Sequence, residues 1–282
     1  MKEFFAGVRP IRLDRLDLPR SWRILVLAPH PDDFESVGVA LRRFHERGHP
    51  LDLLVLSSSA NGVEDSFCDP PTPAGVPGSA RGPSSARLAR GYSPQASGEP
   101  KARPLTAEAK AALREDEQRA GCRFFGLPED RLAFLRLRVT WPGGYLAEEE
   151  ENFTALERVA VGFGFDLAVL PHGNDTNPDH RLTYGWWRRL AASAGRSTAA
   201  LLFRDPKTVA LREDIVLPFD EALAAWKGEL LRFHRSQHRR NLNTRGHGFD
   251  ERILRVNRES AARLRTAEPY AETFELEFTS VS

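Results

Sequence analysis

Two short segments of the sequence concentrate side chains that can bind a metal ion and transfer protons. They are APHPDDFE (28–35) and HGNDTNPDH (172–180). A histidine close to a carboxylate, together with a distant second histidine, matches a catalytic zinc site, which has three protein ligands and one open position for water. Zinc lowers the pKa of that water to about 7, and a carboxylate that does not bind the metal serves as general base. The two segments therefore predict hydrolytic chemistry, provided that they meet in the fold.

Each of these side chains also has an ordinary structural interpretation. His30 alone would be a hydrogen-bonded turn residue, and aspartates beside a helix start, such as Asp32 and Asp33, are common N-caps. Asp179 and His180 could cap the next helix in the same way. The occurrence of all of them after two separate strands favours the metal site.

The residues before each segment predict the strands that position it. Residues 24–28 are apolar and partly β-branched, as in a buried strand, and Pro29 and Pro31 end that strand because proline has no backbone N–H. Residues 165–171 predict a second buried strand. Parallel strands end on the same edge of a sheet, where ligands bind in open α/β folds, so both segments can converge there.

The rest of the chain alternates between predicted strands and helices. Strands are expected at 24–28, 51–59, 131–139, 165–171 and 199–205. Helices are expected at 35–48, 106–125, 147–164, 182–195 and 226–237. This alternation indicates an α/β fold, Rossmann-like, with a mostly parallel sheet flanked by helices. No G-x-G-x-x-G follows the first strand, so a dinucleotide site is not expected.

The composition is typical of a globular protein and does not by itself indicate a class of binding partner. The 282 residues are 41% hydrophobic and carry a net charge of +1, which argues against a polyanion as partner of the whole chain. Two cysteines do not make a disulfide framework. No stretch resembles a signal peptide or a membrane span, so we expect a soluble cytoplasmic protein with no membrane partner.

Residues 1–282 are expected to form a single domain with two irregular parts. Segment 64–104 contains eight of the 20 prolines, which excludes a core element and indicates a long loop or insertion. It is compatible both with a lid over the site and with a surface insertion without a role. Residues 232–282 are expected to be a basic C-terminal extension, because eight arginines lie between 232 and 258.

Taken together, these motifs resemble the LmbE-like (PIG-L) family of zinc-dependent N-acetylglucosamine deacetylases. The similarity rests on APHPDDFE after one buried strand and on DTNPDHR after a later one. Residues 113–127 look like the family's helix between the motifs, with Arg114 and Glu117 at its charged positions. Residues 226–237 look like its C-terminal helix, which ends in Ser-Gln. The far N-terminus and segment 64–104 are not covered.

The resemblance implies a role for most residues of the two motifs. His30, Asp33 and His180 would bind the metal, which would be zinc or another divalent transition metal, since iron, cobalt and nickel accept the same donors. Asp32 would be the general base that takes a proton from the attacking water and later returns one to the leaving amine. Asp179 would orient a neighbouring ligand.

The chain departs from the family pattern at two positions. Phe34 stands where many members have glutamate, which changes no ligand. Asn177 stands where the family often has a histidine that stabilises the oxyanion. An amide can donate a hydrogen bond to an oxyanion but cannot transfer a proton. His172 is a possible catalytic substitute, although a histidine that stabilises a turn is the more common use of such a position.

Further residues have weaker links to function. Asp175 could support the site through hydrogen bonds or be a turn residue. Asn61 could touch the substrate, Arg114 could bind a substrate carboxylate or phosphate, and Trp141 could stack on a sugar ring. Each of them has an ordinary structural use as well.

The arginines of residues 232–258 allow three interpretations. They could bind an anionic group of the substrate, they could bind nucleic acid, or they could form a polar helix face with a basic loop. The near-neutral chain and the lack of an aromatic-rich module argue against nucleic acid. The polar face is the most common use of such a segment.

The sequence predicts an enzyme that removes an N-acetyl group from a small molecule containing N-acetylglucosamine, with water activated by a metal. One alternative is a carbohydrate-binding protein that keeps the metal and has lost turnover, which Asn177 favours. Another is an amidase acting on a different amide, such as a thiol conjugate. The identity of the aglycone and the oligomeric state are not predicted.

Overall fold

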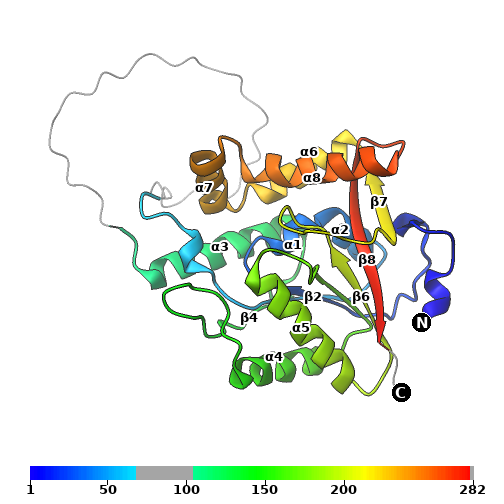
Figure 1. Cartoon of the computed structure of the whole chain (residues 1–282), viewed down its shortest axis with the longest axis horizontal. Helices are drawn as coiled ribbons and strands as arrows, with labels where there is room; N and C mark the ends of the chain where they lie inside the picture. The colour runs from blue at the N-terminus through cyan, green and yellow to red at the C-terminus, as the bar shows by residue number, and fades with distance from the viewer. Residues whose placement is uncertain (68–103, 280–282) are drawn as a thin grey trace, which may run out of the picture.

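The described part of the chain is built on an eight-stranded sheet with the order β1-β7-β8-β6-β5-β2-β3-β4 (Figure 1). The computed structural model describes residues 1–67 and 104–279. The strands are β1 (Ile11–Arg12), β2 (Ile24–Ala28), β3 (Leu51–Val55), β4 (Leu132–Phe134), β5 (Leu167–Pro171), β6 (Thr198–Phe203), β7 (Ile215–Phe219) and β8 (Tyr270–Thr279). All neighbouring strands pair in parallel except β8, which is antiparallel to both β6 and β7. The predicted α/β fold with a mostly parallel sheet is therefore confirmed.

Helices cover both faces of this sheet. They are α1 (Asp33–Ser36), α2 (Gly38–Glu46), α3 (Ala107–Phe125), α4 (Glu150–Phe163), α5 (Pro178–Ser193), α6 (Glu221–Leu231), α7 (Arg235–Arg245) and α8 (Phe249–Leu264). Short 3₁₀ turns are η1 (Lys2–Phe5), η2 (Leu13–Arg15), η3 (Ala60–Gly62) and η4 (Glu129–Arg131). Figure 1 shows α4 and α5 together on one side of the sheet, with α6 and α8 on the other. No helix in the described ranges is long and apolar enough to cross a membrane.

The strand β2 shows why the strands that precede the two polar motifs are apolar throughout. Ile24, Val26 and Ala28 pack into one core with α2 and α6, whereas Leu25 and Leu27 pack into a second core with α4 and α5. Successive side chains of a strand point to opposite faces, so every side chain of a strand that is covered on both faces enters one core or the other. This burial fixes the strand ends, and with them the turns that carry the polar motifs.

The helix predicted at 35–48 is divided into α1 and α2 at Val37. A fully buried ion pair explains the division: Lys227 Nζ lies 2.7 Å from Glu272 Oε1 and donates to Ser36 O, the last carbonyl of α1. The Glu272 carboxylate accepts hydrogen bonds from the backbone N–H groups of Val39 and Ala40 in the first turn of α2. The pair satisfies backbone groups that a continuous helix would have bonded internally.

Residues 232–282 differ from the extension that the sequence suggested. They contain all of α7, all of α8 and the ten-residue strand β8, which lies between β6 and β7 inside the sheet. The helix predicted at 226–237 is also interrupted, because α6 ends at Leu231 and α7 begins at Arg235. The Pro-rich segment 64–104 lies, apart from its first four residues and Pro104, outside the described residues.

Candidate active site

The two polar motifs meet at the carboxyl edge of the sheet, as predicted. His30 and Asp32 lie in the turn between β2 and α1, and β5, which carries the second motif, pairs with β2. The helix α5 begins at Pro178, which occupies its first turn, so Asp179 and His180 also lie in that turn. Proline is favoured at this position, because its missing N–H would have no partner within the helix.

Asp33 lies between two histidine rings that come from different motifs. Its Oδ2 is 3.2 Å from His30 Nδ1, and its Oδ1 is 3.6 Å from His180 Nε2. The ring centroids of the two histidines are 5.6 Å apart. One possible ligand atom from each of these three residues lies within 4.8 Å of the others, so they could hold a single metal ion.

The second nitrogen of each histidine faces another carboxylate. Asp179 Oδ2 lies 2.7 Å from His30 Nε2, while its Oδ1 accepts a hydrogen bond from Leu146 N. Asp175 Oδ2 lies 3.2 Å from His180 Nδ1. Histidine ligands of metals commonly donate their far N–H to a carboxylate, which fixes the tautomer and the ring orientation. We refer to His30, Asp33, His180, Asp175 and Asp179 as the histidine–aspartate cluster.

The electrostatics of this cluster fit a divalent cation. Burial opposes the charged imidazoles, yet hydrogen bonds to aspartates outweigh it and raise the pKa of His30 to about 9 and that of His180 to about 10. Burial also opposes the charged form of Asp33, but the two histidines hold its pKa well below the usual range. A buried site that gathers this much negative charge around two imidazoles has the donor set of a zinc site.

Asp32 lies beside the cluster in a strained backbone conformation, with φ of 108°. Such an angle is rare for a residue with a Cβ, and strained residues of this kind gather at functional sites. Its backbone N–H donates to Gln118 Oε1, and its Oδ2 lies 3.3 Å from Arg114 Nη2. Burial raises the pKa of Asp32, while the guanidinium of Arg114 opposes that shift.

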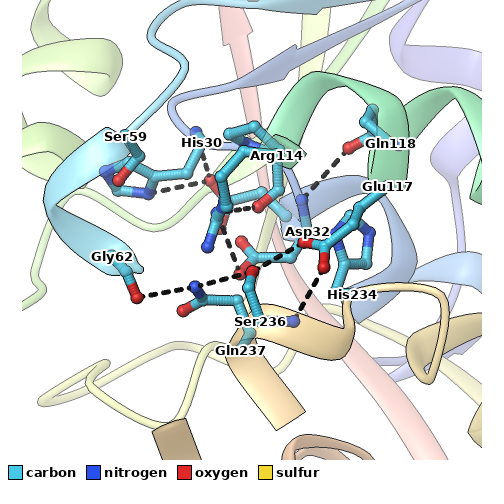
Figure 2. Close-up of polar contacts among 12 residues, drawn as sticks. His30, Asp32, Ser59, Gly62, Arg114, Glu117, Gln118, His234, Ser236 and Gln237 are labelled. Atoms are coloured by element: carbon cyan, nitrogen blue, oxygen red, sulfur yellow. Dashed lines mark hydrogen bonds and ion pairs between the residues drawn. The ribbon is translucent and has the colours of Figure 1, made fainter. Parts of the chain in front are cut away.

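The helix α3 holds the turn that contains Asp32 (Figure 2). Arg114, only 1% exposed, donates to Pro31 O as well as contacting Asp32. It is therefore a positioning residue, and neither a solvated arginine nor one that pairs within its helix. One turn further along α3, Gln118 joins the backbone of Asp32 to the carboxylate of Glu35.

Glu117 on the same helix fixes the start of α7. Its carboxylate accepts hydrogen bonds from Ser236 N and Ser236 Oγ, at 2.7 and 2.6 Å. The neighbouring Gln237 donates to Gly62 O after β3 (Figure 2). The Ser-Gln pair thus begins α7, whereas the sequence suggested that it ends the preceding helix.

Behind Asp32 lies a fully buried pair that the sequence did not reveal. Glu35 Oε2 is 3.1 Å from His234 Nε2, and both side chains are 0% exposed. Burial works against a charged imidazole, but the Glu35 carboxylate raises the pKa of His234 above its ordinary value. The pair packs beneath the Asp32 turn.

A cavity of about 200 Å³ opens above these groups. His30, Asp32, Asp33, Asp179 and His180 form part of its lining, and Asn177 also lies on its wall. Asn177 Oδ1 accepts a hydrogen bond from Asp179 N, which makes the residue the N-cap of α5. Its amide NH₂ group has no hydrogen-bond partner among the described residues, so it can donate to a ligand.

The cavity also contains residues beyond the two motifs. Asn61 lines it, and so does Asp205, which the sequence analysis treated only as the end of a predicted strand. Burial raises the pKa of Asp205, and the nearby His180 opposes that shift. Asp175, His180 and Asp205 form a second set of possible ligands. The signal for Asp205 was similar to that of the motifs, namely a carboxylate shortly after a buried strand.

Two predicted residues do not reach the cavity among the described parts of the chain. His172 follows β5, but its Nε2 lies 3.1 Å from Glu275 Oε2 and its Nδ1 accepts a hydrogen bond from Asn174 N. It is therefore a residue that stabilises the turn. Trp141 is 94% exposed and does not line the cavity, whereas Tyr145 of the same loop does.

Several solved structures share this fold at low sequence identity. The N,N'-diacetylchitobiose deacetylase of Pyrococcus horikoshii matches with a TM-score of 0.63 and 15% identity, over 91% of this chain and 84% of that one. The 4-carboxy-2-hydroxymuconate hydratase of Pseudomonas putida matches with a TM-score of 0.63 and 15% identity, over 92% and 98%. The zinc-inhibited form of a teicoplanin deacetylase matches with a TM-score of 0.59 and 15% identity, over 92% and 100%. Deacetylases and a hydratase use the fold, so the fold alone does not select the reaction.

Comparison of the sequence with protein families is more specific than the shared fold. A search of curated proteins finds no match. A sequence model of the PIG-L family, described as GlcNAc-PI de-N-acetylase, matches residues 25–191, which are more than half of the chain and include both polar motifs. The chain belongs to the PIG-L (LmbE-like) family.

Proposed function

We propose that this protein is a metal-dependent hydrolase that removes the N-acetyl group of a small amino sugar containing N-acetylglucosamine. The observation that carries the proposal is the placement of Asp32 beside His30, Asp33 and His180 at the floor of one cavity. Three potential ligands, with a carboxylate next to them that is not one of the three, are the parts that amide hydrolysis by water requires. Membership of a de-N-acetylase family supports the choice of bond.

His30, Asp33 and His180 would hold the metal, and zinc is the ion that their donor types favour. When bound there, the ion supplies a Lewis acid for the acyl oxygen and lowers the pKa of water. Asp179 and Asp175 keep His30 and His180 in the orientation that presents Nδ1 and Nε2 to Asp33. The protein's part is thus a rigid set of donors that is assembled before substrate arrives.

Asp32 would take the proton of the attacking water and return one to the departing amine. A carboxylate can accept a proton from water and later return it to an amine. Arg114 and Gln118 prevent the Asp32 turn from relaxing. The free NH₂ of Asn177 would donate a hydrogen bond to the oxygen that becomes negative in the transition state.

The cavity supports a small substrate. Its volume of about 200 Å³ is below the ~300–1,000 Å³ of pockets for drug-sized ligands, which suits one sugar ring with a small substituent. Asn61 and Tyr145 at its border offer a hydrogen-bonding amide and a ring that a sugar can contact. A cytoplasmic location remains a prediction from the sequence.

Metal analysis together with acetate release tests the proposal. The parent protein and Asp32→Asn would be loaded with zinc, and both would be assayed on a panel of N-acetylglucosaminides. We expect about one metal per chain in both and acetate from the parent alone. Metal without turnover in either would favour the carbohydrate-binding alternative, and cleavage of a different amide without acetate would favour the amidase. Absence of metal from the parent would refute the mechanism.

A further inference from the structure

One wall of the cavity is basic, opposite in charge to its floor. Lys207, Arg240, Arg245 and Arg252 line it, and we call these four residues the basic wall. Lys207 follows β6, Arg240 and Arg245 belong to α7, and Arg252 belongs to α8. Three chain segments therefore bring positive charges to one cavity, although the whole chain carries a net charge of only +1.

Within the described ranges, these cations lack the carboxylate partners that would make them structural. No carboxylate of residues 1–67 or 104–279 lies within ion-pair distance of the side chains of Lys207, Arg245 or Arg252. Arg240 makes one long contact of 3.5 Å, to Gly62 O. Elsewhere in the fold, Arg136 and Arg212 show the structural use of arginine, since they bind Glu115 and Asp214 at 2.7 and 2.9 Å. Among residues 1–67 and 104–279, the side chains of Lys207, Arg245 and Arg252 therefore have no carboxylate partner.

The wall is also built to hold its charges close together. Arg252 is half-buried, and burial lowers the pKa of its guanidinium. Asp205 opposes this shift, whereas the adjacent charge of Arg245 adds to it. Like charges kept together in a partly buried place favour binding of an anion, because the anion removes their mutual repulsion. The anchoring of α7 through Glu117 and Ser236 keeps part of the wall in position.

We infer that the basic wall is a binding site for an anionic substituent, a phosphate or a carboxylate, carried by the amino sugar whose acetyl group lies over the metal. This inference rests on the proposed function and narrows it to acidic substrates. Guanidinium groups bind both kinds of anion through paired N–H donors, so the shared chemistry is that of an oxyanion with two acceptor oxygens.

The test compares acidic and neutral substrates on matched variants. N-acetylglucosamine would be compared with its 1-phosphate, its 6-phosphate and its 3-O-lactyl ether, which carries a carboxylate. The first variant is Arg252→Gln. Because Arg252 is half-buried and its replacement could alter packing, the exposed Arg245 is also replaced, as Arg245→Gln. Arg239→Gln is the control. Arg239 is exposed on α7 and does not line the cavity.

We expect kcat/KM to be higher for at least one acidic substrate than for N-acetylglucosamine. Arg252→Gln and Arg245→Gln should remove roughly 10–100-fold of that value for the acidic substrate, the range expected for loss of a charged hydrogen bond. They should reduce the value for the neutral substrate much less than the value for the acidic one, and Arg239→Gln should change neither. Equal use of both substrate types, or equal loss on both in the two variants, would overturn the inference and leave the proposed function intact.

A binding measurement separates failure of the inference from failure of the proposed function. Inorganic phosphate and malonate would be titrated calorimetrically into the parent and the same variants. If no sugar is deacetylated but these anions bind and bind more weakly to Arg252→Gln and Arg245→Gln, the wall is an anion site on a protein with another activity. If the anions fail to bind, or bind equally to all variants, the inference is wrong, because any binding then occurs elsewhere, for instance at the metal.

Discussion

The histidine–aspartate cluster and the basic wall border the same cavity but are constructed in opposite ways. In the cluster, both nitrogens of His30 and of His180 face carboxylates, and the residues follow two adjacent strands of the sheet. In the wall, Arg245 and Arg252 come from helices outside the sheet and make no ion pair with a described residue. The histidines of the cluster already contact carboxylates of the protein, whereas Arg245 and Arg252 of the wall remain available, among the described residues, to bind a charged ligand.

This difference suggests a division of labour between chemistry and selection. A reaction centre benefits from groups that are already oriented, because they need not reorganise during the reaction. A recognition surface benefits from charges whose partner arrives with the substrate, since a built-in carboxylate would compete for them. The five predictions that follow test this contrast, beginning with the largest expected effect.

Removal of a metal ligand should abolish the reaction. His180→Ala should bind less than one metal per chain and lose more than roughly 10³-fold in kcat, because the ion is worth several kcal/mol of transition-state stabilisation. Metal analysis and acetate release would measure both effects. Arg245→Gln, in the basic wall, is the control and should keep its metal. Loss of metal from Arg245→Gln would contradict the separate roles given to the cluster and the wall.

Loss of the general base should affect chemistry without affecting the metal. Asp32→Asn preserves the shape of the side chain and removes its ability to accept a proton, so kcat should fall roughly 10²–10⁴-fold. The metal content should equal that of the parent. Unchanged turnover would show that another group, such as Asp205, accepts the proton.

The carboxylates behind the histidines should have an intermediate effect. Asp179→Asn removes the charge that holds His30 Nε2, and such substitutions lower metal affinity or activity about 10–100-fold. Competition with a chelator would measure the affinity. His172→Gln is the matched control, because His172 contacts Glu275 outside the cavity and its replacement should leave metal affinity as it is. Equal losses in both variants would contradict this assignment.

The contact that joins α7, which carries two residues of the basic wall, to α3 should contribute to the stability of the fold. Glu117→Gln weakens two buried hydrogen bonds to Ser236 and should lower the free energy of unfolding by about 1.5–3 kcal/mol. Urea denaturation would measure it. The neighbouring Asp116 is exposed, so Asp116→Asn should stay within about 0.5 kcal/mol of the parent. If the inference about acidic substrates is right, KM for them should rise in Glu117→Gln more than kcat falls.

The smallest effect concerns the loop that contains Trp141. Trp141→Ala should change kcat/KM less than about twofold, because the ring is 94% exposed and lies away from the cavity. Tyr145→Ala should raise KM more than this, since Tyr145 lines the cavity. A reversed order in the steady-state kinetics would mean that the loop moves over the substrate.

The sequence predicted the site best where a motif follows a strand directly. Strand β2 and the residues after it form one continuous signal, so the placement of His30 and Asp33 at the sheet edge depends on few steps of inference. The long helix α3 was equally predictable, since Thr106 caps its start through Ala109 N and Gly126 ends it at φ of 93°. Its ends depend on local backbone chemistry alone.

The parts that the sequence did not reveal depend on contacts between distant segments. Glu35 and His234 look like surface residues in the sequence, yet each is buried because the other lies opposite, 199 positions away (234 − 35). The strand β8 alternates polar and apolar residues, which is a strand signal. The preceding arginines nevertheless led to the interpretation of residues 232–282 as a basic extension. The central position of β8 could not be read from the sequence, because strand order depends on which helices cover which face.

The central position of β8 has a consequence for how the chain acquires its structure during synthesis. Among the strands that the structure describes, β7 joins the rest of the sheet only through β8, and β1, which is synthesised long before β7, pairs only with β7. Residues 11–12 therefore have no place in the sheet until residues 270–279 have left the ribosome. Pairings between segments so far apart form slowly. The nascent chain can pair strands β2 to β6, which position both polar motifs, before β8 has been synthesised to join β7 and β1 to them.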